Sequence, residues 1–168
     1  GDIFVTGTSK GATGDAGHNY GVFVDGGSIS SVSGNVFVTG TGANDSWADH
    51  NYGVLIWASG AVAGNPNPDG FGTGGTSTSA SITSINGTVT VTGTGGGAGE
   101  SSHNAGVFLN SGGAIGAGAQ KTVTVTGTGG GPTGGFNTGV PIWNQDQTTA
   151  PMITSNGGNV VVHGNGGG

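Results

Sequence analysis

Several residue types that carry chemistry are missing or rare in this chain of 168 residues. Cysteine is absent, which excludes disulfides, thiolate metal sites and cysteine nucleophiles. Lys10 and Lys121 are the only Lys or Arg residues, against eight carboxylates, and the formal net charge is −6. Binding to a nucleic-acid backbone needs several cations, so we expect neither nucleic acid nor an anionic membrane surface as a partner.

Glycine, in contrast, occupies 42 positions, while charged residues make up 6% of the chain and aromatic residues 7%. Glycine loses more backbone entropy on folding than any other residue, so a chain with so much of it could remain disordered. Disorder usually accompanies high charge and few β-branched residues. Here charge is scarce and Val, Ile and Thr recur in alternating runs, which predicts an ordered β protein.

One strand-like motif occurs five times, and its central copies read Thr-Val-Thr-Val-Thr-Gly-Thr. The copies begin at Asp2, Asn35, Thr88, Thr122 and Asn159. A second motif, Asn-x-Gly-Val, follows each of the first four copies, and a shorter apolar segment closes each unit. The chain therefore reads as a single repeat domain, 1–168, with units 2–34, 35–87, 88–121 and 122–158 and a partial unit 159–168, in which a loop insertion at 63–80 lengthens the second unit.

Alternation with a period of two places the valines of each first motif on one face and its threonines on the other. One unit cannot bury that apolar face alone, whereas stacked units form a continuous core with parallel ladders at about 4.8 Å. The predicted fold is all-β, a right-handed parallel β-solenoid (β-helix) with coils of about 33 residues and three short strands each. A β-sandwich would need short hairpin loops and would not return the same residue type to the same unit position.

The units, with Val-x-Val-Thr-Gly-Thr and Asn-x-Gly-Val, resemble the β-strand repeats of giant bacterial surface and secreted proteins, such as filamentous-haemagglutinin-like adhesins and autotransporter stalks. The resemblance implies an extracellular or cell-surface β-helix used as a stalk, fibre or adhesive surface. It carries over no catalytic residue.

Two polar columns run through the second motif. We expect the asparagines to form a structural ladder of side-chain amides at a turn, since buried amides are usually hydrogen-bonded. The residues before them include three histidines, which are metal-competent but which we interpret as solvent-facing turn residues. The asparagines are Asn19, Asn51, Asn104 and Asn137, and the histidines are His18, His50 and His103.

The outward face of the first motif carries a threonine array that resembles the ice-binding face of some β-solenoid antifreeze proteins. Threonine is also an ordinary residue on an exposed strand face, so this surface-binding function is an alternative hypothesis. The array comprises Thr6, Thr8, Thr39, Thr41, Thr92, Thr94, Thr126 and Thr128.

The outward positions of the second strand carry apolar residues, which predict an exposed contact surface for the insertion, a neighbouring fibre or a stacked sugar. This candidate surface comprises Phe23, Leu55, Phe108, Trp57 and Trp143.

Paired carboxylates across a groove would indicate a carbohydrate-active β-helix, the less favoured alternative. The chain has no arginine and no serine-nucleophile motif. We therefore expect no catalytic residue, no metal site and no cofactor, and the chain is predicted not to be an enzyme.

No segment reads as a signal peptide or a membrane-spanning helix, so we expect no membrane insertion. The chain starts and stops inside a unit, which favours an excerpt of a longer protein or a polymerising subunit. The predicted function is a structural module of an extracellular filament, stalk or adhesin. Its expected partners are copies of itself or further repeats of the same chain, with host-surface or glycan contact as a further hypothesis.

Overall fold

A computed structural model describes residues 1–11, 17–44, 48–58, 79–145 and 149–168. This part of the chain forms twelve strands in three parallel sheets, and it contains no helix long and apolar enough to cross a bilayer. The prediction of an all-β fold is confirmed. The loop insertion expected at 63–80 falls almost entirely outside the described residues; Ala80, at its end, is the first residue of a strand.

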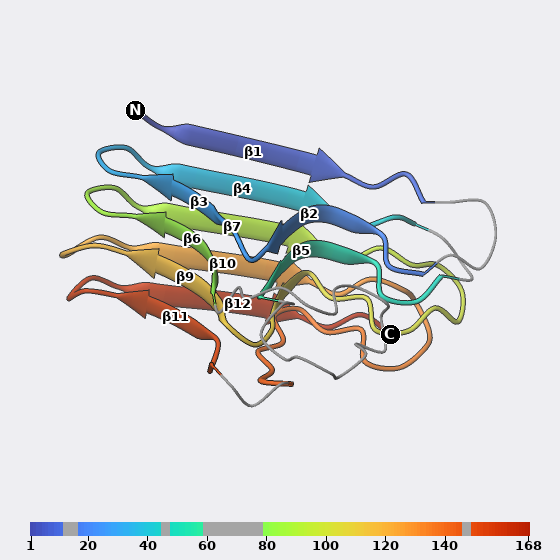
Figure 1. Ribbon diagram of the computed structural model, residues 1–168. Coiled ribbons are helices and arrows are strands. Elements are labelled where there is room, and N and C mark those ends of the chain that lie inside the picture. Colours follow the sequence, from blue (N-terminus) through green and yellow to red (C-terminus); the bar gives the residue numbers. More distant parts are fainter. Residues whose placement is uncertain (12–16, 45–47, 59–78, 146–148) are drawn as a thin grey trace.

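The strands enter the three sheets in turn as the chain proceeds, and each sheet is a stack of neighbours from successive units (Figure 1). The five-stranded sheet contains β1 (Ile3–Thr8), β4 (Val36–Thr41), β7 (Val89–Thr94), β10 (Val123–Thr128) and β12 (Val160–Asn165). The three-stranded sheet contains β2 (Tyr20–Asp25), β5 (Tyr52–Trp57) and β8 (Val107–Leu109). The four-stranded sheet contains β3 (Ser28–Ser31), β6 (Ala80–Ser84), β9 (Gly113–Ala117) and β11 (Met152–Ser155).

Pairing within the five-stranded sheet follows the motif position by position. Val36 of β4 lies opposite Ile3 on one side and Val89 on the other, and Gly40 lies opposite Gly7 and Gly93. The same register continues through β10 to β12. Equivalent residues of the motif copies therefore stack in columns across the sheet.

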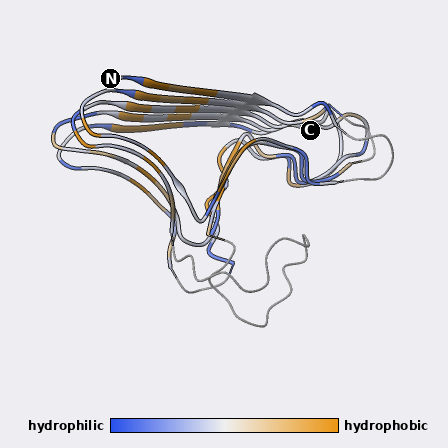
Figure 2. Cartoon of the chain, turned by 45° about the horizontal axis from the view of Figure 1, so that its top comes forward, coloured by the Kyte–Doolittle hydropathy of each residue, from blue (hydrophilic) through white to orange (hydrophobic). Residues whose placement is uncertain are grey.

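The inward residues expected from alternation form one core between the sheets. Val89, Val91, Val123 and Val125 are fully buried, together with the isoleucines of β6 and β9. Figure 2 shows the hydrophobic segments in orange at corresponding places along successive strands. Burial of these aliphatic side chains supplies the main favourable contribution to stability.

The glycine of each Thr-Gly-Thr motif lies directly against the backbone of the second motif of the same unit. A Cβ atom on Gly40 would meet the backbone carbonyl oxygen of Gly53, and one on Gly93 would meet that of Gly106. Only glycine leaves room for the second backbone, so the motif alternates outward threonines with an obligatory inward glycine.

Two features differ from the expectation of three strands and a buried core in every unit. The second motif of the fourth unit forms only an isolated bridge, Leu109 to Ile142, because Pro141 cannot donate a ladder hydrogen bond. At β12, the inward Val160 and Val162 are 44% and 45% exposed, because β10 is the only strand that pairs with β12 among the described residues.

Candidate functional site

The four asparagines of the second motif form a continuous chain of side-chain hydrogen bonds. The Nδ2 of Asn19 donates to Oδ1 of Asn51 at 2.8 Å, Asn51 to Asn104 at 2.9 Å and Asn104 to Asn137 at 3.0 Å. The backbone N–H groups of Asn51 and Asn104 donate to the next Oδ1 as well, at 3.0 Å and 3.1 Å. Asn51, Asn104 and Asn137 are buried, so these amides hold the turns of neighbouring units together.

The residues before these asparagines form a stack of rings. The ring centroids of His18, His50, His103 and Phe136 follow one another at 4.9 Å, with interplanar angles of 19°, 11° and 13°. That interval matches the separation of neighbouring strands, so the sheet spacing sets the ring spacing. All four residues have positive φ, between 57° and 70°, which is uncommon for non-glycine residues and places the rings on one side of the turn.

This ring stack is a poor geometry for a shared metal ion. A zinc–nitrogen bond is about 2.0–2.1 Å, so two nitrogens bound to one ion lie at most roughly 4.2 Å apart. Equivalent nitrogens of near-parallel rings with centroids 4.9 Å apart exceed that limit. The described residues also contain no group of three His, Cys, Asp or Glu side chains that could hold a metal ion.

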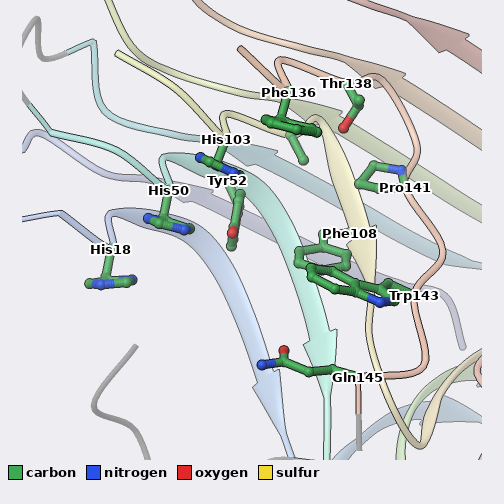
Figure 3. A pocket seen from close by; sticks show the side chains of 11 residues that line it. His18, His50, Tyr52, His103, Phe108, Phe136, Thr138, Pro141, Trp143 and Gln145 are labelled. Atoms are coloured by element: carbon green, nitrogen blue, oxygen red, sulfur yellow. The ribbon is translucent and has the colours of Figure 1, made fainter. Parts of the chain in front are cut away.

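A groove with a volume of about 380 Å³ lies beside the ring stack. Figure 3 shows the stack along one side of the groove and Phe108 with Trp143 on the other. Apart from histidine, the described residues of its lining include no ionisable acid or base other than the Tyr52 phenol. The lining residues are His18, His50, Tyr52, His103, Ala105, Phe108, Phe136, Thr138, Pro141, Trp143 and Gln145.

We expected a row of five apolar residues at outward positions of the second strand to be exposed. This prediction is wrong for three of them. Leu55, Trp57 and Phe108 are buried in a second apolar cluster with Tyr52 and Ala105. Their outward-facing side chains remove apolar area from water by packing on one another, so they do not form a free surface.

The remaining two members of that row behave differently from each other. Phe23 is half-buried against the second cluster and contacts the Tyr20 ring at a centroid distance of 5.1 Å. Trp143, in contrast, is 59% exposed and lines the groove. It is therefore the one member of the predicted surface with a large exposed area.

The threonine array lies on the outer face of the five-stranded sheet. Strand register aligns Thr6, Thr39, Thr92 and Thr126 in one column, which His163 of β12 continues. The second column aligns Thr8, Thr41, Thr94 and Thr128 and continues to Asn165. Beside them, the rings of Phe4 and Phe37 are stacked at 4.9 Å.

Two of the carboxylates accept hydrogen bonds from the backbone of the next unit. Oδ1 of Asp2 accepts from the N–H of Asn35 at 2.8 Å, and Oδ1 of Asp49 accepts from the N–H of Ser102 at 2.6 Å. These contacts link neighbouring units. Asp15, Asp45, Asp69 and Asp146 lie outside the described residues.

A column of serine hydroxyls was not anticipated from the sequence. Ser31, Ser84 and Ser155 each accept a hydrogen bond from the backbone N–H of the glycine three residues later, at 3.0, 2.9 and 3.0 Å. The sequence does contain the pattern that could have predicted this column: the third motif ends in Ser in three units, and Ala117 takes the equivalent position in the other. The groove residues Tyr52, Thr138 and Gln145 were also missed, and no repeat pattern marks Gln145.

Comparisons with known proteins add no relative: no family model, curated protein or solved structure matches this chain.

Proposed function

We propose that this chain is a right-handed parallel β-solenoid that serves as a structural module of an extracellular filament, stalk or adhesin. The cyclic entry of strands into three sheets, with matching register in each, supports the solenoid. The right-handed sense follows from the strong preference of parallel β crossovers for that hand.

The observation that carries the structural function is the exposure of core positions in β12. Val160 and Val162 of β12 occupy the same columns as Val123 and Val125 of β10, which are fully buried. The 44% and 45% exposure of the β12 valines leaves apolar core area in water, together with an unpaired row of backbone groups. A further layer of strands in the same register, from further repeats of the same chain or from a second copy, would cover both.

The opposite end offers the matching surface. Within the described part of the chain β1 pairs with β4 alone, and its inward residues Ile3 and Val5 pack at the edge of the core. Placing β12 of one copy on β1 of the next continues every column, with Val160 against Ile3 and Gly164 against Gly7. Because the two surfaces differ, this contact is head-to-tail and generates an open filament.

The mechanical role follows from the internal contacts. Neighbouring units are joined by parallel ladders, by the asparagine chain and by the Asp2 and Asp49 contacts. Each unit therefore contacts the next at several places along its length, as expected of a load-bearing stalk.

Electron microscopy and sedimentation of the purified protein at neutral pH test this proposal. Filaments that lengthen with protein concentration and show an axial rise of about 4.8 Å per coil would support it. A monodisperse monomer across the accessible concentration range would contradict end-to-end assembly.

A second candidate function rests on the threonine array. Thr8, Thr94 and Thr128 are exposed, and parallel register repeats them at the strand spacing across the sheet. Such a regular surface suits ice binding. Thermal hysteresis that is lost in a Thr94→Lys/Thr128→Lys double variant would favour this function, and the absence of hysteresis in the original chain would exclude it.

Carbohydrate cleavage is the least favoured of the candidate functions. Asp2 and Asp49 are both engaged with backbone N–H groups of the neighbouring unit. An assay for glycan degradation by the purified chain tests it directly, and we expect no cleavage.

A further inference from the structure

The groove beside the ring stack combines apolar and polar groups in its lining. Trp143 and Phe136 present large apolar surfaces, with 59% and 74% of each residue exposed. His103, Thr138 and Gln145 contribute polar atoms to the same lining. A ligand that fills it therefore has one apolar face and an edge of hydrogen-bonding groups.

At the centre of the ring stack, a ligand in the groove meets the edges of the rings and not their faces. His103 lies between His50 and Phe136, with both ring centroids 4.9 Å away, so its two faces are covered. Its edge carries the imidazole nitrogens, which donate or accept hydrogen bonds. The stack thus supplies a polar margin along the direction in which the strands stack (Figure 3).

The opposite wall is fixed by the bridge near the end of the three-stranded sheet. The N–H of Trp143 donates to the carbonyl oxygen of Leu109 at 2.9 Å, which anchors the backbone that bears the indole. Gln145 accepts a hydrogen bond at Oε1 from Nδ2 of Asn110, at 3.0 Å. The backbone that carries the indole and the Gln145 carboxamide are therefore held in place before a ligand arrives, which lowers the entropy cost of binding.

The charge of the lining residues further limits the chemical class of the ligand. Among the described residues that line the groove, none is Asp, Glu, Lys or Arg. Three imidazoles are the only basic side chains of this described lining, and they offer hydrogen bonds more than fixed charge, which favours a neutral ligand.

We propose that this groove binds a neutral, linear oligosaccharide, which lies along the stacking direction of the strands. The apolar C–H face of a sugar ring packs on the Trp143 indole, and its hydroxyl groups bond to His103, Thr138 and Gln145. A saturated acyl chain would offer no hydrogen-bonding group to His103 and Thr138, and an acidic glycan would find no Lys or Arg among the described lining residues. The proposal is independent of filament formation, because all lining residues belong to one copy of the chain.

Isothermal titration calorimetry with cellohexaose and chitohexaose tests the proposal on the full chain, with an oligogalacturonate as the acidic comparison. We expect saturable binding of at least one neutral hexasaccharide and none of the acidic one. Trp143→Ala should weaken that binding by about tenfold or more, and Trp143→Phe should keep most of it.

Phe4→Ala is the matched control, because Phe4 is also a largely exposed aromatic residue, at 73% against 59% for Trp143, and lies outside the groove. It should leave the dissociation constant within about twofold, and an unchanged melting curve should show that each variant is folded. No saturable binding of either neutral hexasaccharide overturns the proposal. So does binding that Trp143→Ala leaves unchanged, or selective binding of a proline-rich peptide in place of the sugars.

Discussion

Oδ1 of Asn104 accepts two hydrogen bonds from Asn51, a residue 53 positions earlier: one from the side-chain Nδ2 at 2.9 Å and one from the backbone N–H at 3.0 Å. Asn104 in turn donates both its own N–H groups, backbone and side chain, to Oδ1 of Asn137. One side chain thus connects three units through buried polar groups.

Asn104→Ala is expected to lower the free energy of unfolding by about 2–4 kcal/mol, because it leaves buried donors of Asn51 and the acceptor of Asn137 with fewer partners. Urea denaturation followed by circular dichroism measures the change. Asn86→Ala is the control, since Asn86 is exposed and donates to the carbonyl oxygen of Val32. Equal losses in the two variants would show that the asparagine chain adds no stability.

Gly93→Ala should destabilise the protein severely, by about 3 kcal/mol or more, because the added Cβ meets the backbone oxygen of Gly106. Gly116→Ala is the matched control, because Gly116 also lies in a strand but its added Cβ would meet only atoms at 3.5 Å or beyond. Thermal melts of both variants should separate them clearly. A tolerated Gly93→Ala would mean that the two sheets can move apart at this position.

Val162→Lys should prevent end-to-end assembly, since it places a charge in the apolar column that the next copy would cover. His163→Lys is its control, with the same charge on the next residue, which points to the opposite face of β12. Sedimentation should show shorter assemblies for the first variant and unchanged ones for the second. Equal assembly of both variants would contradict stacking through β12.

Zinc is expected to leave the melting temperature unchanged, because the imidazoles of His18, His50 and His103 are spaced too widely to share an ion. The measurement is a thermal melt with and without an excess of Zn²⁺, followed by chelation with EDTA. A rise in melting temperature that His50→Ala removes would instead demonstrate a metal site in the ring stack.

Much of the fold could be read from the amino-acid sequence, because local alternation decides which side chains share a face. Val89 and Val91 face inward for that reason, and the recurrence of Thr-Gly-Thr aligns the strands in register. The asparagine column could be placed in the same way, since one amide per unit recurs at the same position of the second motif.

The burial of individual side chains and the position of the groove depend on tertiary neighbours. A local sequence pattern does not reveal those neighbours. Leu55 and Trp57 are at outward positions, yet they are buried, because neighbouring aromatic residues pack against them. Val162 has the pattern of a core residue, yet it is exposed, because only one of the described strands pairs with its own. The groove likewise requires Trp143 and His103, 40 residues apart in the chain, to face a common space, and only the packing of the units places them there.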